Sequence, residues 1–246
     1  MAIESVVNVG VGIAAAAARR VPAGGGRVRP PSRGGFAFLS LPPAPRGVAA
    51  GLKRLTDLGV GASLILTLAP AMLVIALIIR LKSPGPILVR QERFGRDLRP
   101  FSMLKFRSMV DGAEGMLGDL SHLNEAGGPL FKIRKDPRLT PVGAVLRRFS
   151  LDELPQLVNV LRGEMSLVGP RPPLPPEVEA DYLRQRIRLR FPPGMTGLWQ
   201  VSGRSELRYE AMIGLDYTYM RGWSPLQDIR ILLRTVPAVI TGKGAC

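Results

Sequence analysis

The sequence predicts an α+β protein that is mostly helical and membrane-associated, with a small β-hairpin and a cytoplasmic domain that carries amphipathic helices. Three observations indicate this class: an uncharged apolar run at 58–79, two alternating segments within 87–109, and helical periodicity in the C-terminal half. We therefore expect a low-complexity tail at 1–50, a membrane-inserted helix at 51–82, and one domain at 83–246.

The charge balance predicts an anionic partner. The chain holds 34 Lys and Arg against 19 Asp and Glu, which suits nucleic acid, a phosphorylated substrate or an anionic lipid surface. Aromatic content is only 6% and no nucleic-acid recognition motif occurs, so we expect no nucleic-acid partner. A single cysteine, Cys246, excludes an internal disulfide, and a single histidine, His122, argues against zinc. Any metal is expected to be a hard cation on carboxylates, such as Mg²⁺.

The first 50 residues are rich in Ala, Gly, Pro and Arg and show no periodicity. Such a segment buries too little apolar surface to offset its ordering entropy, so we predict disorder. A secretory signal is the alternative, but Glu4 replaces a basic start, and Arg19 and Arg20 follow the apolar run rather than precede it. A start codon other than Met1 also stays open.

The apolar run at 58–79 covers 22 residues without a charge. A straight helix of that length reaches about 33 Å, which is enough to cross the apolar part of a bilayer. Pro70 lies within it and is expected to break or bend the helix. Basic residues occur on both flanks, which favours a helix that enters the membrane and returns to the same side: Arg46, Lys53, Arg54, Arg80 and Lys82. A proline-kinked spanning helix stays open as the alternative.

After this run the periodicity changes to two. The segments "ILVRQERF" and "PFSMLKFRSM", joined by "GRDLR", predict a β-hairpin whose second strand places Phe101, Met103, Lys105 and Arg107 on one face. Residues 111–130 predict a mobile loop. We expect short helices in "TPVGAVLRRF" and at 152–162, the latter ending at Gly163.

Two further helices are predicted near the C-terminus. "PPEVEADYLRQRIRLR" is expected to form one helix, with acids in its first half and arginines in its second, an order that complements the helix dipole. The last helix is expected to begin at Ser224 and Pro225. Its apolar stripe, beside Arg230 and Arg234, either faces the core or lies on a lipid surface.

The candidate chemistry centres on two adjacent acids, Asp152 and Glu153, in "SLDELPQL". Ser150 and Glu153 match a helix capping box, and Asp152 as the cap would place Pro155 in the first turn. Five cations come from nearby motifs: Lys105, Arg107, Arg147, Arg148 and Arg171. A carboxylate pair among so many cations can bind Mg²⁺ and face a phosphate, which outlines a phosphoryl-transfer site.

Four segments carry a family resemblance: "KRLTDLGVGASLILTLAP", "SPGPILVRQERFGRDLRPFSMLKFRSM", "DPRLTPVGAVLRRFSLDELPQLVNVLRGEMSLVGPRP" and "PPGMTGLWQVSGR". Over about residues 51–243 the chain resembles the bacterial sugar transferases, the monotopic polyprenyl-phosphate glycosyl-1-phosphate transferases, in their small catalytic-core form. The resemblance implies transfer of sugar-1-phosphate from a nucleotide-diphosphate sugar, usually a UDP-sugar, to undecaprenyl phosphate, with release of UMP. This would be the first membrane step of surface glycan synthesis, and 83–246 would be the catalytic domain.

The resemblance also implies roles for particular residues. Asp152 would be the nucleophile that forms a phospho-aspartate, and Glu153 would hold Mg²⁺ with it or orient the acceptor. Substrate or phosphate contacts would come from the remaining candidates: Lys105, Arg107, Arg147, Arg171, Trp199, Gln200 and Arg204. The alternative for the last three is a structural turn around Gly197 and Gly203. Asp216 and Asp228 lie at family-like positions, where surface or capping roles are favoured.

In this family the membrane helix enters one leaflet, turns at a proline and returns, so the resemblance favours re-entry. Members commonly carry Ser before that proline, whereas this chain has Ala69, with Thr67 and Ser63 as the nearest hydroxyls. The implied location is the bacterial inner membrane with the domain in the cytoplasm, and a homodimer is compatible with this class. The rivals are an inactive scaffold of a glycan-assembly complex and a basic, membrane-bound nucleic-acid-binding protein. The sugar is not predicted.

Overall fold

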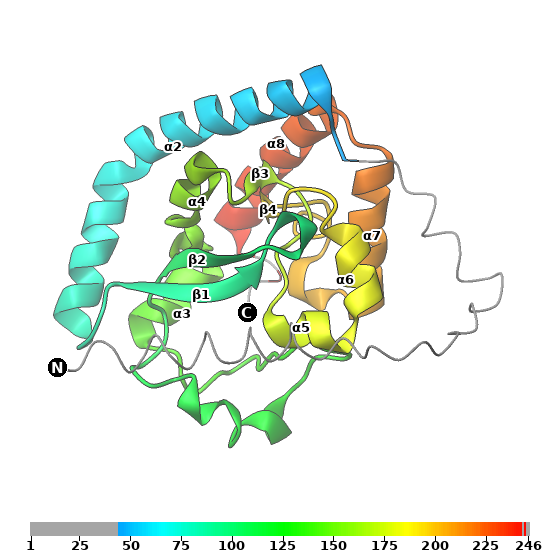
Figure 1. Ribbon diagram of the computed structural model, residues 1–246. Coiled ribbons are helices and arrows are strands. Elements are labelled where there is room, and N and C mark those ends of the chain that lie inside the picture. The colour runs from blue at the N-terminus through cyan, green and yellow to red at the C-terminus, as the bar shows by residue number, and fades with distance from the viewer. Residues whose placement is uncertain (1–43, 243, 245–246) are drawn as a thin grey trace, which may run out of the picture. The chain divides into compact units, whose positions relative to one another are not determined.

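The computed structural model describes residues 44–242 and residue 244, so the predicted tail lies outside the described residues except for its end. The chain forms a long helix, a hairpin and then short helices around a small parallel sheet (Figure 1). The helices are α2 (Gly47–Lys82), α3 (Pro141–Arg148), α4 (Gln156–Arg162), α5 (Pro175–Ala180), α6 (Tyr182–Arg188), α7 (Tyr209–Arg221) and α8 (Pro225–Thr241). The strands are β1 (Leu88–Phe94), β2 (Pro100–Phe106), β3 (Ser166–Val168) and β4 (Gly194–Thr196).

Helix α2 begins at Gly47 rather than at residue 51, and it continues through Pro70. The chain therefore bends within one helix instead of breaking into two, and Figure 1 shows the change of direction between the two ends of α2. Proline lacks the N–H that would bond the carbonyl of Leu66. The nearby hydroxyls do not replace that bond: Thr67 Oγ1 donates to Ser63 O at 2.9 Å, and Ser63 Oγ donates to Gly59 O at 2.8 Å.

Helix α2 is long and apolar enough to cross a membrane, and only 11% of its most apolar 18-residue window is buried. Leu66, Leu73 and Leu81 are more than 70% exposed, at 77%, 72% and 73%. Isolated exposed leucines are ordinary, but a helix that exposes this many apolar side chains is a candidate for contact with a membrane.

The predicted hairpin is confirmed. Strands β1 and β2 pair antiparallel, with Val89 opposite Lys105, Gln91 opposite Met103 and Arg93 opposite Phe101. Directly opposed residues lie on the same face of a sheet, so this face holds both apolar and basic side chains. The turn between the strands places Asp97 and Leu98 in the left-handed region.

Helix α3 confirms the short helix predicted in "TPVGAVLRRF". The Oγ1 of Thr140 accepts a hydrogen bond from Gly143 N at 2.9 Å and caps its first turn. Helix α4 ends at the predicted glycine, Gly163, which adopts φ 83°. Its predicted start was wrong. The helix begins at Gln156, and residues 151–153 form a separate 3₁₀ turn.

The helix predicted over 175–190 is two helices, α5 and α6, separated at Asp181, whose φ of −143° is not helical. The order of acids and arginines along the segment did not reveal this break, because several of these residues form tertiary contacts. Glu177 and Arg188 are buried and pair with other segments, and Asp181 accepts a hydrogen bond from Tyr209 Oη at 3.0 Å.

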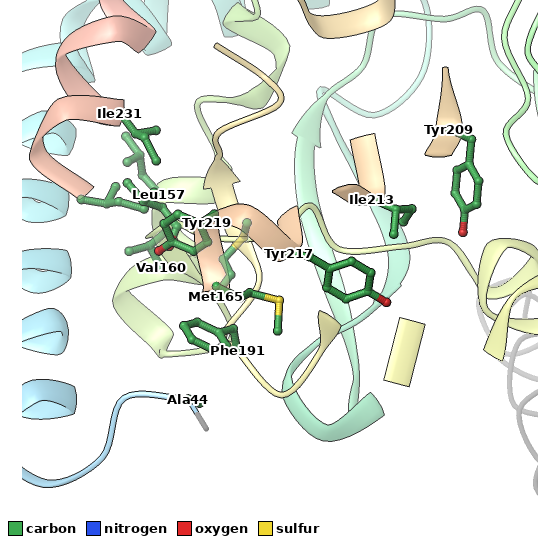
Figure 2. Close-up of a cluster of buried hydrophobic side chains, with 13 residues drawn as sticks. Ala44, Leu157, Val160, Met165, Phe191, Tyr209, Ile213, Tyr217, Tyr219 and Ile231 are labelled. Atoms are coloured by element: carbon green, nitrogen blue, oxygen red, sulfur yellow. The ribbon is translucent and has the colours of Figure 1, made fainter. Parts of the chain in front are cut away.

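The main core lies around β3 and β4. Figure 2 shows Leu157 and Val160 of α4 grouped with Tyr219 of α7 and Ile231 of α8. A second cluster joins the end of α2 to the hairpin and α3 through Ile79, Phe106 and Leu146. The C-terminal end of α2 therefore packs on the domain.

The N-terminal part of α2 packs on the same domain. Arg54 donates to the carbonyls of Val160 and Leu161 at 2.6 and 2.7 Å, which satisfies the last turn of α4. Lys53 forms a 2.6 Å ion pair with Asp228 at the start of α8. Both ends of α2 are thus fixed to one domain.

Helix α8 begins as predicted, with Ser224 Oγ accepting a hydrogen bond from Gln227 N at 3.2 Å. Its apolar stripe divides between two environments. Ile231 is buried and Leu232 packs against the core, whereas a second set of apolar side chains is exposed: Leu226, Ile229, Leu233, Val236 and Ile240.

Candidate active site

The two adjacent acids lie on the 3₁₀ turn Leu151–Glu153, between α3 and α4. Ser150, just before them, adopts φ 53°, a left-handed conformation that is uncommon for a residue with a side chain. Its Oγ accepts a hydrogen bond from Arg204 Nη2 at 2.6 Å. The capping-box prediction was therefore wrong, because the serine hydroxyl is used by a distant arginine instead of a local backbone N–H.

One lysine faces both acids. The Nζ of Lys105, on β2, lies 2.9 Å from Glu153 Oε1 and 3.9 Å from Asp152 Oδ2. The side chain of Asp152 is 7% exposed, whereas that of Glu153 is 31% exposed. The pair thus combines a buried carboxylate with a more accessible one that is bound to the ammonium group.

These surroundings separate the two acids in proton affinity. Burial raises the pKa of Asp152; Lys105 offsets part of this rise, and the negative charge of Glu153 adds to it. Burial also acts on Glu153, but the attraction of Lys105, with Arg171 and Arg93, outweighs it and lowers the pKa of Glu153. Two neighbouring carboxyls with opposite shifts are suited to different roles in one reaction.

Two predicted arginines join Lys105 around the pair. Arg147, on α3, donates from Nε to Ser108 Oγ at 3.0 Å, and its charge lowers the pKa of Asp152. Arg171, in the loop after β3, lies 3.2 Å from Glu177 and lowers the pKa of Glu153. The structure therefore brings Lys105, Arg147 and Arg171 together from three segments.

Arg93 was missed by the sequence analysis. Its side chain is buried on β1, where burial and the nearby Arg171 lower its pKa to about 9, against the attraction of Glu177. It donates to the carbonyl of Pro172 at 3.0 Å, next to Arg171. Strand alternation could have found it, because Arg93 shares a face with Met103 and Phe101, and a charged residue on an apolar face needs a partner.

A buried ion pair supports the same loop. Arg188 donates to Asp216 Oδ2 at 2.8 Å from Nε, and to the backbone carbonyl of Arg171 at 3.1 Å from Nη2. Burial raises the pKa of Asp216 to about 6, although Arg188 opposes this rise. Asp216 was expected to have a surface or capping role, but it is fully buried.

The remaining candidates lie apart from the acids or reach them indirectly. Arg107 donates to Ser83 O at 2.8 Å, at the end of α2. Trp199 and Gln200 lie in the loop after β4, and Gln200 Nε2 donates to Met195 O at 3.0 Å. Trp199 Nε1 and Gln200 Oε1 have no hydrogen-bond partner within residues 44–242 and 244, so nucleotide contact through them stays a prediction.

Arg204 approaches the acids through Ser150 and also donates to Ala238 O on α8 at 3.0 Å. Arg148, the fifth predicted cation, lies over the Phe149 ring at 5.5 Å from its centre. It is exposed, and Arg147 rather than Arg148 acts on the acid pair.

In the described part of the chain, no three His, Cys, Asp or Glu side chains form a group that could hold a metal ion by themselves. Asp152 and Glu153 nevertheless fit Mg²⁺, which is commonly bound by one or two carboxylates together with substrate phosphates and water. The set of two carboxylate donors therefore suits a magnesium ion that arrives with a phosphorylated substrate.

The family model for bacterial sugar transferases matches residues 48–242. The chain belongs to this family. The match includes the whole of the acid pair's surroundings and nearly all of α2. This sugar transferase therefore carries the family's core, including both the apolar helix and the domain that holds the acids.

Curated relatives agree with this assignment. The sugar transferase is 38% identical over 197 residues to the exopolysaccharide production protein ExoY of Sinorhizobium fredii, covering 78% of this chain and 87% of that protein. It is 46% identical over 165 residues to the galactosyl transferase CpsE of Streptococcus agalactiae, covering 67% and 37%. It is 41% identical over 215 residues to the UDP-glucose:undecaprenyl-phosphate glucose-1-phosphate transferase of Caulobacter vibrioides, covering 82% and 75%.

The chain spans most of ExoY but less than half of CpsE. The region shared with CpsE is therefore only a part of that longer protein. The family and the name of the Caulobacter vibrioides relative support a sugar-phosphate transferase.

Proposed function

We propose that this protein transfers sugar-1-phosphate from a UDP-sugar to undecaprenyl phosphate and releases UMP, as a step in exopolysaccharide or related glycan synthesis. The observation that carries the proposal is the acid pair, in which a buried Asp152 and a Lys105-bound Glu153 lie among cations from three segments. The Caulobacter vibrioides relative, which is named for glucose-1-phosphate transfer to undecaprenyl phosphate, supports the reaction class.

In the first step, a carboxylate oxygen of Asp152 attacks the β-phosphorus of the UDP-sugar. A P–O bond forms to Asp152, the bond to the bridging oxygen breaks, and UMP leaves. The sugar phosphate is then held as an acyl phosphate. In the second step, an oxygen of undecaprenyl phosphate attacks the same phosphorus, and the Asp152 carboxylate is the leaving group. Covalent catalysis of this kind divides one difficult displacement into two easier ones.

The other groups have electrostatic tasks. Lys105 lowers the pKa of Asp152 and so increases the fraction of the nucleophilic carboxylate. Arg147 and Arg171 are placed to bind phosphate oxygens, for which a planar guanidinium is well suited. Asp152 and Glu153 would hold Mg²⁺, which supplies positive charge to the phosphoryl oxygens when bound.

The packing of α2 supports a membrane location in which this helix enters and returns. Lys53 and Arg54 attach its N-terminal part to the domain, and Ile79 attaches its C-terminal end. A helix that spans the bilayer could not have both ends on one domain. The exposed leucines of α2 and the exposed stripe of α8 would then contact lipid, with the domain in the cytoplasm of the bacterial inner membrane.

The test is to trap the intermediate. The full chain is incubated with UDP-sugar labelled in the β-phosphate, without undecaprenyl phosphate, and then quenched and digested with trypsin. Label is expected on the peptide of residues 149–162, with fragment ions that place it on Asp152. Hydroxylamine should remove it, as it does acyl phosphates. Lipid product without any label on this peptide would refute the proposal, and UMP release across a panel of UDP-sugars identifies the donor.

The pH dependence gives a second test. Only the Asp152 carboxylate can attack, and burial raises its pKa, so kcat/KM is expected to fall on acidification at a pH above the ordinary value of about 3.9. Lys105→Met removes the cation that lowers this pKa and should move the acid limb to higher pH. The exposed Lys135 supplies a matched control, Lys135→Met, whose limb should not move. An unmoved limb in Lys105→Met would contradict the assigned role.

A further inference from the structure

A small cavity of about 130 Å³ lies at the C-terminal end of α2, where it meets the segment after β2 and the start of α3. Its lining includes Ile79, Lys82, Ser83, Arg107, Thr140 and Val142. One water molecule accounts for roughly 30 Å³ of liquid volume, so the cavity has room for a group larger than a single water. None of the cations around the acid pair lines it.

Arg107 is the unusual member of this cavity. Arg107 is 5% exposed, and within residues 44–242 and 244 its Nη2 alone has a hydrogen-bond partner, the carbonyl of Ser83 at 2.8 Å. Nε and Nη1 are buried and have no hydrogen-bond partner among the residues that the structure describes. Leaving such donors unpaired is costly, particularly on a charged group, so the arrangement indicates a ligand that accepts hydrogen bonds.

The backbone at Gly85 leaves room for the guanidinium group of Arg107. Gly85 adopts φ 107°, and a Cβ there would lie 2.1 Å from Arg107 Nη1, so only glycine allows the guanidinium to lie where it does. Asp111 is a near neighbour, with its Cγ 3.7 Å from the same hypothetical Cβ, but it accepts no hydrogen bond from Nε or Nη1 of Arg107 in the described part of the chain. Within those residues, Nε and Nη1 of Arg107 donate to no carboxylate.

We propose that this cavity binds a phosphate group, as a site separate from the acid pair. A guanidinium with two unpaired donor nitrogens suits phosphate, and Lys82 adds a second cation at the lining. The N-terminal end of α3, at Thr140 and Val142, adds the positive end of a helix dipole. Ile79 and Val142 provide an apolar wall. The phosphate belongs either to the headgroup of an anionic lipid or to a free phosphate compound.

The test measures binding by isothermal titration calorimetry, with the full chain in a neutral maltoside detergent. One arm titrates inorganic phosphate against chloride at equal ionic strength. The other titrates dioctanoyl-phosphatidylglycerol against dioctanoylglycerol, which lacks the phosphate. Binding in the lipid arm alone identifies a headgroup site, and binding of inorganic phosphate alone identifies a site for free phosphate. Either result supports the proposal. An absence of binding in both arms overturns it.

Arg107→Gln should weaken binding at least about tenfold, because it removes the charge and the unpaired donors. Arg90→Gln, at an exposed position on β1, is the matched control and should bind like the original chain. Val142→Phe fills the cavity without changing its charge and should remove binding. Lys82→Gln, at an exposed position, should weaken it. If Arg107→Gln fails to fold, the other two variants decide. Unchanged affinity in Val142→Phe and Lys82→Gln would overturn the proposal.

Discussion

Asp152→Asn is expected to stop UMP release, with a fall in rate of about a thousandfold or more, while the protein stays folded. The amide is nearly isosteric with the carboxylate but cannot attack phosphorus, and losing a covalent nucleophile has effects of this size. Stability should not fall. Burial raises the pKa of Asp152, which means that the ionised side chain is unfavourable in the folded state at neutral pH. The midpoint of thermal unfolding is therefore expected to be unchanged or higher.

The matched control is Asp119→Asn, at an exposed position in the loop between β2 and α3, which should alter neither the rate nor the unfolding midpoint. Rates come from UMP release, and unfolding is followed in the same detergent. Full activity in Asp152→Asn would eliminate the phospho-aspartate mechanism. A large loss of stability in this variant would instead show that the buried carboxylate is held by favourable contacts that outweigh its burial.

Local signals predicted the elements that depend on local contacts. Three predictions depended on such contacts: the short helix in "TPVGAVLRRF", the helix end at Gly163 and the cap at Ser224. All three were confirmed, and the structure adds that Thr140 caps the first helix and that Gly163 is left-handed. The hairpin followed from strand alternation in two adjacent segments. Pattern analysis is reliable here because the residues that decide the structure are neighbours in sequence.

Pattern analysis failed where residues that are distant in the sequence determine the local structure. Ser150 fits a capping box, yet its hydroxyl accepts from Arg204, and the resulting left-handed turn places the acids on a 3₁₀ turn before α4. The helix predicted over 175–190 divides at Asp181, which accepts a hydrogen bond from Tyr209, and Glu177 and Arg188 pair with residues outside it. Such tertiary ion pairs leave no periodic signal, so the sequence cannot separate them from a surface charge pattern.

The candidate site was predicted in composition more than in geometry. Asp152, Glu153, Lys105, Arg147 and Arg171 come together. Arg107 belongs to the same motif as Lys105, but it lies two residues later, just beyond the end of β2. Its side chain contacts the end of α2 rather than the acid pair. Residues of a single motif therefore contribute to two sites: the acid pair and the junction between α2 and the domain.

At the other end of α2, Lys53 attaches the helix to the domain. Replacing Lys53 should have the largest effect on stability. The side chains of Lys53 and Asp228 are 5% and 9% exposed and lie 2.6 Å apart. Lys53→Met would leave Asp228 buried without its cation, which is expected to cost about 3–5 kcal/mol of unfolding free energy. Trp223 Nε1 donates to Asp228 at 3.3 Å, so tryptophan fluorescence during thermal or denaturant unfolding should report the loss.

The double variant Lys53→Met/Asp228→Asn tests whether the loss comes from the stranded charge. It should be more stable than Lys53→Met alone, because the neutral amide can still accept the bond from Tyr219 Oη, which lies 2.7 Å from Asp228 Oδ1. Lys135→Met, on the surface, should change little. If the double variant loses the sum of both single effects, then Lys53 stabilises the fold through packing of its stem and its bond to Val168 O at 2.9 Å, rather than through the ion pair.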